Sequence, residues 1–461
     1  MDRRVIKKTV TDIKVGEVDL IPIAGKLPTS KDNIFDYKVN TILDTVVDYP
    51  KFSYGFQYFL HQTKDKTEMF TDPMYNKNKP YRIVNPFEHS IKEYDNSVAD
   101  MAVKYFDLTT KPRILDRAFY KLWEMIHIFD LIPIDQSNYV TAHLAEAPGA
   151  FVQATMYFRD KFIGNKYTTK NDKYHAITLH PDSEDILSLN KEFINYCAKE
   201  KPERFLPYAT CKTSEIKNGE GGCNGDLTKV KTIKNFANTF GKDKRAQFVT
   251  GDGGFDVKLE NMQEQETSKL FLGQIITAIK IQEKGGNFVC KFFEAFTEPT
   301  VKYLYILTQL YEEVYLYKPL FSRESNSEKY VVCKNYLNTV EKNEKLIKIL
   351  EGILSESAGS KYIIDIFPEF KLPKEFVSMI TIINSSIANK QFVAINEMIK
   401  YIELNNFYGD IYKQYRNRQI KANEYWNTTY YQETLQKNEK LLKDSLDRTN
   451  KKVKQLASVL I

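Results

Sequence analysis

The pattern of apolar and polar positions is most regular between residues 139 and 336, where short apolar runs alternate with longer helix-like segments. The predicted strands are VTAHL, HAITLHP, AQFVTGDGG, GGNFVCKFF, VYLYKP and EKYVVCKNY, and the predicted helices include residues 262–283 and TVKYLYILTQLYEE. Alternation of buried strands with helices predicts an α/β fold with a mostly parallel, doubly wound sheet. In such a sheet, ligands bind at the carboxyl ends of the strands.

The flanks of this core have different patterns. Residues 1–110 are rich in turn residues and poor in periodic runs, which indicates an irregular α+β extension. A helix is predicted from Arg113, since apolar residues then recur at helical spacing as far as Phe129. Residues 337–461 are lysine-rich and predicted to be helical. We therefore divide the chain into an extension (1–110), a core domain (111–336) and a helical region (337–461).

The last segment of the chain is predicted to be an amphipathic helix with a coiled-coil-like stripe. Its stripe residues follow one another at alternating steps of four and three: Leu442, Leu446, Val453, Leu456 and Leu460. Such a stripe either packs back on its own domain, which is the interpretation we favour, or binds a partner.

Composition narrows the class of protein. The chain has 461 residues, of which 42% are hydrophobic and 27% charged, a balance typical of globular proteins. Its net charge of +6 permits a phosphate-bearing partner without requiring one. Neither a secretory signal nor an apolar run long enough to cross a membrane is found. The five cysteines form no C-x-x-C pair, so we expect a reducing compartment and no disulfide framework or zinc site.

Two glycine-containing turns are candidate ligand sites. At Glu146–Phe151 a strand ends and a helix begins, and Gly149 would let the backbone approach a ligand closely. The turn lacks the full G-x-G-x-x-G, which disfavours a nicotinamide site. Residues 219–228 contain three glycines at 219–222 and then Gly225 and Asp226, and the aspartate could accept a hydrogen bond from an exocyclic amine. Taken alone, the first is better explained as an ordinary tight turn and the second as a surface loop.

Two charged residues lie at predicted strand ends. Asp252 follows an apolar strand and is flanked by glycines, so it should point into the crevice of the sheet. Lys291 lies near the end of another apolar strand, where burial and a nearby like charge would lower its pKa and make it a candidate base. The alternative is a lysine that extends from the rim of the sheet into solvent. A third polar cluster, residues 322–330, precedes a strand and by itself reads as a loop.

Taken together, these segments resemble the FtsJ-type ribose 2′-O-methyltransferases, most closely the cap-specific mRNA enzymes of eukaryotes and large DNA viruses. The resemblance extends from Asp116 to Tyr336. The motifs that carry it stand in the family's order: HLAEAPGAF, GEGGCNGDLT, GDGGF, GGNFVCKFFEAFT and SRESNSEKYVVCK. It implies a Rossmann-like methyltransferase core that uses S-adenosylmethionine.

The resemblance also implies a catalytic Lys-Asp-Lys-Glu tetrad. Its members here are Lys121 (in DRAFYK), Asp252, Lys291 and Glu328. Transfer of a methyl group to a ribose oxygen needs in-line placement and removal of the 2′-OH proton, without a metal. Lys291 would accept the proton and Lys121 would hold the ribose oxygen. Asp252 and Glu328 would orient the lysines, and their charges should leave the pKa of Lys291 only partly lowered.

Cofactor contacts are implied from residues that match the family's motifs. They are Asp116, Glu146, Pro148, Gly149, Ala150, Phe151, Asp226 and Leu227, the last two for the adenine. Ala150 replaces a family glycine, Asp116 a common asparagine and Glu324 a proline. Asp182 is the candidate partner for the cofactor ribose.

The resemblance therefore predicts methylation of the first transcribed nucleotide of capped RNA. Methylation of ribosomal or transfer RNA is the alternative within the same chemistry, and a non-catalytic RNA-binding subunit of a capping complex is the alternative of another class. Candidate cap contacts in the extension are Tyr54, Phe56, Tyr58 and Glu88. Expected partners are capped RNA and a capping complex bound through the C-terminal helix, with no membrane. The expected location is the cytoplasm, a viral factory or a virion, with the nucleus as an alternative.

Overall fold

The computed structural model describes residues 15–46, 51–66, 79–180, 187–207, 224–241, 244–254, 260–338, 343–404 and 409–459. The strands are β1 (Ile23–Lys26), β2 (Thr41–Asp44), β3 (Val140–Leu144), β4 (Lys173–Ile177), β5 (Phe205–Pro207), β6 (Ala246–Gly251), β7 (Gln282–Phe292), β8 (Tyr311–Lys318), β9 (Lys329–Tyr336) and β10 (Tyr362–Ile366). The helices before β6 are η1 (Ile34–Asp36), α2 (Tyr54–Asp65), α4 (Pro80–Val84), α5 (Val98–Tyr105), α6 (Ala118–Phe129), α7 (Ala150–Phe162), α8 (Lys191–Glu200) and α10 (Val230–Ala237). Those after β6 are η3 (Glu260–Met262), α11 (Gln263–Ile281), α12 (Glu298–Leu310), α13 (Glu344–Glu356), α14 (Lys374–Leu404), α15 (Asp410–Tyr430) and α16 (Glu439–Val459).

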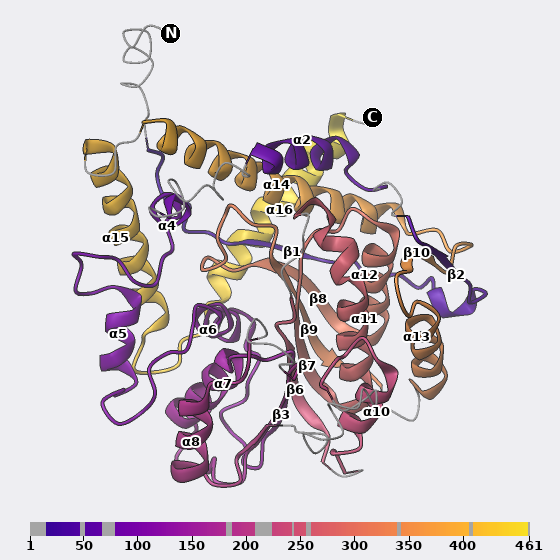
Figure 1. Ribbon diagram of the computed structural model, residues 1–461, viewed down its shortest axis with the longest axis horizontal. Helices are drawn as coiled ribbons and strands as arrows, with labels where there is room; N and C mark the ends of the chain where they lie inside the picture. Colours follow the sequence, from indigo (N-terminus) through magenta and orange to yellow (C-terminus); the bar gives the residue numbers. More distant parts are fainter. Residues whose placement is uncertain are drawn as a thin grey trace, which may run out of the picture.

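The central sheet has eight strands in the order β1-β8-β9-β7-β6-β3-β4-β5. The pairs β7·β6, β6·β3, β3·β4 and β4·β5 are parallel, whereas β9 runs antiparallel between β7 and β8. Helices cover both faces, with α6, α7 and α8 on one side and α10, α11 and α12 on the other (Figure 1). The predicted α/β fold with a mostly parallel sheet is confirmed.

Each face of the sheet is buried in a core of its own. Successive side chains of a strand point to opposite faces, so Phe288 and Cys290 join the core under α11 and α12, whereas Val289 joins the core under α6 and α7. The predicted helix at residues 300–313 ends at Leu310, because Tyr311 already begins β8. The predicted glycine-led strand begins three residues before its glycines, at Gln282.

Segments from both flanks pack on this core and on each other. β1 extends the main sheet by pairing with β8, and β2 pairs with β10 in a separate two-stranded sheet. β10 interrupts a region that the sequence predicted to be helical. The boundaries at residues 110 and 336 stay predictions, but the flanks on either side of them meet in space.

The predicted C-terminal helix is α16, and it packs back on the sheet as we favoured. Leu442 and Leu446 lie against the core beside α6, and Ser445 and Thr449 donate hydrogen bonds to the carbonyls of Pro22 and Ala24. Both carbonyls belong to the chain at β1. Leu460 lies outside the described residues, as do Asp182 and the glycines of residues 219–222.

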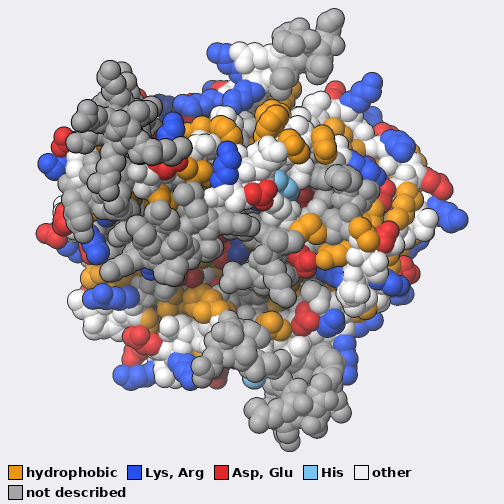
Figure 2. All heavy atoms as spheres, turned by 45° about the horizontal axis from the view of Figure 1, so that its top comes forward, with side chains coloured by type: hydrophobic (Ala, Val, Ile, Leu, Met, Phe, Trp, Pro, Cys, Tyr) orange, Lys and Arg blue, Asp and Glu red, His pale blue; other side chains and the backbone are white. Residues whose placement is uncertain are grey.

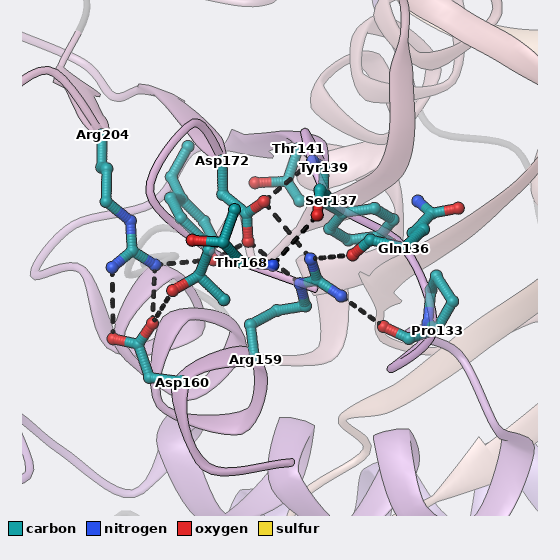
Figure 3. Close-up of polar contacts among 12 residues, drawn as sticks. Pro133, Gln136, Ser137, Tyr139, Thr141, Arg159, Asp160, Thr168, Asp172 and Arg204 are labelled. Carbon is teal, nitrogen blue, oxygen red and sulfur yellow. Dashed lines mark hydrogen bonds and ion pairs between the residues drawn. The ribbon is translucent and has the colours of Figure 1, made fainter. Parts of the chain in front are cut away.

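A buried ion-pair network joins α7 to the amino ends of the strands (Figure 3). Arg159 donates from Nε to Asp172 at 3.0 Å and from its other nitrogens to the carbonyls of Pro133 and Gln136. Asp172 in turn accepts the N–H of Tyr139 at 2.9 Å, next to the start of β3. The network thus fixes one end of α7, whose other end carries the turn at Gly149.

Candidate active site

The four residues of the predicted tetrad meet at the carboxyl ends of β6 and β7. Asp252 directly follows β6, and Lys291 is the second-to-last residue of β7. Because β9 runs antiparallel to β7, its first residues lie beside the end of β7, which brings Glu328 to the same edge. Lys121 reaches this edge from the first turn of α6.

The tetrad forms two lysine–carboxylate pairs. The Nζ of Lys121 lies 2.7 Å from Oε1 of Glu328 and 2.9 Å from its Oε2. The Nζ of Lys291 lies 3.2 Å from Oδ1 of Asp252. All four side chains keep between 10% and 18% of their surface exposed, so they are enclosed but still reachable from outside.

Tyr330 is a fifth member that motif reasoning missed. Its hydroxyl donates a hydrogen bond of 2.9 Å to Oδ1 of Asp252, the same oxygen that faces Lys291. Tyr330 lies opposite Lys291 in the register of β7 and β9. The sequence did hold a signal, because Tyr330 stands two residues after Glu328 and therefore on the same side of the chain in extended backbone.

The pKa of Lys291 shifts opposite to the sequence prediction. Burial lowers it, as expected, but the charges of Asp252 and Glu328 together outweigh burial, and the pKa ends above its ordinary value. The prediction of a partly lowered pKa is therefore wrong for the ligand-free protein. Burial opposes ionisation of Glu328 too, but Lys121 and Lys291 lower its pKa to about 2. At neutral pH Lys291 of the ligand-free site is thus protonated and Glu328 is ionised.

Asp116 borders this group of charges. Its Oδ1 accepts the N–H of Ala118 at 2.6 Å at the start of α6. Burial raises its pKa, the charge of Asp252 adds to the rise, and Lys121 and Lys291 oppose it. Asp116 therefore lies within electrostatic reach of the tetrad, and its charge also contributes to the raised pKa of Glu146 in the predicted cofactor turn.

The turn at Glu146–Phe151 is stabilised by the carboxylate of Glu146. Glu146 Oε1 accepts the backbone N–H groups of Phe151 and Val152 at 2.8 and 2.9 Å, while its buried Oε2 has no partner in the described structure. Burial raises the pKa of Glu146 well above its ordinary value. Gly149 has φ +114°, a conformation that strongly favours glycine. Pro148 precedes it, and Ala150 begins α7 with a buried side chain that fits without displacing the turn.

The second predicted loop lies beside the same turn. Gly225 has φ +75°, and a Cβ there would lie 1.9 Å from the carbonyl oxygen of Thr178, so glycine is required at this close approach. The hydroxyl of Thr178 also accepts the N–H of Ala147 at 3.4 Å. Thr178 thus joins the two predicted cofactor segments just after β4.

The side chains of the second loop are already engaged. Asp226 Oδ1 accepts the N–H and the hydroxyl of Thr228. Leu227 is buried in the core against α11, and Phe151 is buried in the opposite core, so in the ligand-free protein neither side chain is exposed to a ligand.

The four candidate cap contacts divide into two groups. Glu88 is buried between Arg117 and Arg323, at 2.9 and 2.8 Å, so it is not free to grip a base. Despite burial, these two arginines keep its pKa below the ordinary value. Tyr54, Phe56 and Tyr58 are instead exposed on α2, by 53%, 48% and 47%.

α2 is anchored next to the tetrad. Its Lys64 donates to Glu294 Oε1 at 2.6 Å, and its His61 lies 3.2 Å from Oε2 of the same carboxylate. Glu294 follows Lys291 by three residues, so one buried carboxylate connects α2 to the end of β7. The exposed aromatic residues of α2 thus lie on a helix fixed to the edge that carries the tetrad.

Comparison with known proteins gives one family. Residues 114–336 match the model of the family described as FtsJ-like methyltransferase.

No helix within the described residues is both long and apolar enough to cross a membrane.

The curated relatives carry the name cap-specific mRNA (nucleoside-2′-O-)-methyltransferase. Number 2 of Drosophila melanogaster is 29% identical over 275 residues, 58% of this chain and 36% of that protein. Number 1 of Mus musculus is 34% identical over 242 residues, 48% of this chain and 26% of that protein, and number 1 of Homo sapiens is 34% identical over 239 residues. The matches thus span about a third or less of these relatives' length.

A solved structure that matches is that of a putative ribosomal RNA methyltransferase from Plasmodium falciparum. It is 16% identical, covers 48% of this chain and 98% of its own, and superposes with a TM-score of 0.32.

Proposed function

We propose that the protein transfers a methyl group to the ribose 2′-hydroxyl of RNA, a proposal supported by the match of residues 114–336 to the FtsJ-like methyltransferase family. The observation that carries the proposal is the pair of lysine–carboxylate contacts at the carboxyl ends of β6 and β7. That edge is where a doubly wound sheet binds ligands. The four side chains are enclosed enough to hold a ribose in place and still accessible to it.

The residues next to the tetrad fit S-adenosylmethionine, whose sulfonium supplies the methyl group. The buried Oε2 of Glu146 lacks a partner among the described residues and would accept a hydrogen bond from the amino group of the cofactor. Gly149, with φ +114°, would let the backbone at the N-terminus of α7 come close to the cofactor. Asp226, held beside the same turn through Thr178, would contact the adenine.

We assign the proton transfer to Lys291. Its neutral amine would accept the 2′-OH proton as the oxygen attacks the methyl group. Its pKa is raised in the ligand-free protein, so only a small fraction is neutral at pH 7. A sulfonium cation beside it would disfavour the ammonium form, because like charges repel. Lys121, held by Glu328, would hold the ribose oxygen.

We propose capped mRNA as the substrate, with the first transcribed nucleotide as the target. The names of the curated relatives support this choice over ribosomal or transfer RNA. The intact set of two lysines and two carboxylates supports an enzyme over a non-catalytic subunit. The stripe of α16 is occupied at Leu442 and Leu446, which does not favour docking of a capping complex through those residues.

The extension would contribute to RNA binding through α2. Its exposed Tyr54, Phe56 and Tyr58 can stack on bases, and stacking contributes about 1–3 kcal/mol per base. α2 lies at the top of the molecule beside α14 (Figure 1). When that side is turned forward, hydrophobic side chains are seen at the surface among basic ones (Figure 2).

We place this activity in the cytoplasm, in line with the free thiols. Cys197, Cys290 and Cys333, the cysteines within the described ranges, are buried and unpaired. Reduced thiols are the ordinary state of cysteine in that compartment.

Methyl transfer from labelled S-adenosylmethionine to one RNA with either an m7G cap or a 5′ triphosphate tests the substrate. We expect the capped RNA to react much faster, with the label on the ribose of the first nucleotide. Equal rates, or label at internal positions, would favour ribosomal or transfer RNA. No transfer to any RNA would favour the non-catalytic subunit. Binding of RNA should weaken as salt rises, since phosphate contacts release counterions.

The double variant Tyr54→Ala/Tyr58→Ala tests α2. It should raise the KM for capped RNA about tenfold or more, since each lost stack removes at least about 1 kcal/mol, and leave cofactor affinity unchanged. Leu337→Ala is the matched control, because Leu337 is also exposed but follows the far end of β9. An equal KM in the double variant and the control would remove α2 from the RNA-binding surface.

A further inference from the structure

A third lysine is buried close to the tetrad but has no part in the chemistry described above. Lys318 is the last residue of β8 and is only 4% exposed. Its Nζ lies within hydrogen-bond distance of the Ser322 hydroxyl (3.1 Å), the Asn326 carbonyl (2.9 Å) and side chain (3.2 Å), and the Glu328 carbonyl (2.9 Å). An ammonium has three N–H donors, so these oxygens can satisfy all of them.

Burying a charged lysine among neutral oxygens costs free energy, which its hydrogen bonds must offset. Burial lowers the pKa of Lys318 to about 7, with Glu328 opposing the shift and Lys329 and Lys121 adding to it. Within the described residues, its hydrogen-bond partners all lie on one stretch of chain, Ser322 to Glu328. Lys318 is thus enclosed by the loop that leads into β9.

This loop ends in a tetrad residue. The carbonyl of Glu328 accepts from Lys318, and its carboxylate, on the same residue, holds Lys121. The Ser322 hydroxyl donates to the same carbonyl at 3.1 Å. Lys318 and Ser322 together fix the backbone from which the Glu328 side chain extends.

Both flanks of the chain hold the loop from outside. Arg323 pairs with Glu88 of the extension at 2.8 Å, and the Gln391 side chain on α14 donates to the Ser325 carbonyl at 3.1 Å. With its outer side fixed by these contacts and its inner side by Lys318, the loop has little freedom left. Small displacements of a catalytic group have large effects on rate.

We propose that Lys318 is a positioning residue that fixes the backbone of Glu328 and, through its carboxylate, the ammonium of Lys121. This inference deepens the proposed function and rests on it. It predicts that loss of Lys318 lowers the rate of methyl transfer at saturating substrate and leaves cofactor affinity in place, because the contacts of Lys318 in the described part of the chain are with the loop before β9.

The test is a double-mutant cycle between Lys318→Met and Glu328→Gln, measured by single-turnover methyl transfer. Lys318→Met alone should slow transfer by about 10- to 100-fold, on the scale of a lost charged hydrogen-bond network. In the Glu328→Gln background the same change should cost less than about threefold, because the carboxylate that it positions is already gone. Lys302→Met is the matched control: Lys302 is also a buried lysine, 2.6 Å from Asp365 beside β10, and its loss should leave the rate per folded molecule unchanged.

Two outcomes would overturn the inference. One is a rate for Lys318→Met equal to that of Lys302→Met. The other is full additivity with Glu328→Gln, which would make Lys318 act independently of the carboxylate. If Lys318→Met does not fold, Ser322→Ala replaces it in the same double-mutant cycle with Glu328→Gln. This substitution removes one hydrogen bond to the Glu328 carbonyl and keeps the lysine. If the wild-type protein transfers no methyl group to any RNA, the proposed function fails first, and the positioning role falls with it.

Discussion

The two ends of the central sheet both carry buried ion pairs, but they are built differently. At the amino ends, Arg159 and Asp172 are fully buried, and the guanidinium also donates to two backbone carbonyls. At the carboxyl ends, the pairs Lys121–Glu328 and Lys291–Asp252 stay partly exposed. Next to them, a buried oxygen of Glu146 has no hydrogen-bond partner in the part of the chain that the structure describes.

This difference separates a structural ion pair from a reactive one. The Arg159 network is closed, so a ligand would have to break existing bonds to enter it. The tetrad instead sets like and opposite charges side by side around accessible atoms, which favours a changing charge in a bound ligand. Burial of an ion pair alone is therefore weak evidence of function, whereas residual exposure at the carboxyl ends of strands points to a site.

The largest effect that separates the two ends is expected at Lys291. Lys291→Ala should lower the methyl-transfer rate by at least about 2 to 4 orders of magnitude, the scale of a positioned acid–base group. Lys291→Arg should not restore the rate, because arginine does not give up its proton. Calorimetry should find cofactor affinity little changed in both variants. Substantial turnover by Lys291→Arg, with a wild-type pH profile, would make the lysine an electrostatic clamp.

The opposite result is expected at the closed end. Asp172→Asn leaves Arg159 buried without its charge partner and should lower the free energy of unfolding by about 3–5 kcal/mol. The rate per folded molecule should stay at the wild-type value, which denaturant titration and kinetics below the melting temperature would check. Glu203→Gln, at an exposed pair with Lys173, is the control and should change stability by less than about 1 kcal/mol. A slowed reaction in folded Asp172→Asn would contradict the division between the two ends.

The raised pKa of Lys291 sets the direction of the pH dependence. Below that pKa, the neutral form of the amine grows about tenfold per pH unit, so the rate should rise with pH and level off only in the alkaline range. Stability should change in the other direction. The stabilisation from Lys291 is present in full below the pKa of an unfolded lysine and is lost as pH rises through the folded value. A rate that is flat from pH 6 to 9 would contradict Lys291 as the proton acceptor.

The smallest effect expected at the reactive end is that of Tyr330→Phe. It removes one hydrogen bond to Asp252, worth about 0.5–1.5 kcal/mol, and should slow transfer by roughly 2- to 12-fold. The same substitution at Tyr139, which is buried at the closed end, is the control and should leave the rate unchanged. Identical rates for Tyr330→Phe and Tyr139→Phe would show that Tyr330 does not help to orient Asp252.

Motif order predicted the sheet and the residues that meet at its edge, because each of them directly borders a strand or helix with a clear pattern. Contacts between distant segments were not predictable in the same way. β1 is four residues long, and its partner β8 lies almost 300 residues away, so no local pattern marks it. The role of Lys318 depends on how a loop folds around it.

The error on the pKa of Lys291 has the same origin. Its apolar neighbours in sequence indicated burial, which does act to lower the pKa. The opposing effect depends on how closely Asp252 and Glu328 approach, and both distances are set by three-dimensional packing. Sequence identified the charges at the site but not which of them would dominate.

The central claim, transfer to a ribose hydroxyl, is tested most directly with two capped RNAs that differ in one atom. One carries an ordinary ribose at its first transcribed nucleotide, and the other carries 2′-deoxyribose there. With labelled S-adenosylmethionine, we predict label on the first RNA and none above background on the second, although both should bind with similar affinity. Equal labelling of the two RNAs would contradict the claim, because the methyl group would then be going to an atom other than that 2′-oxygen.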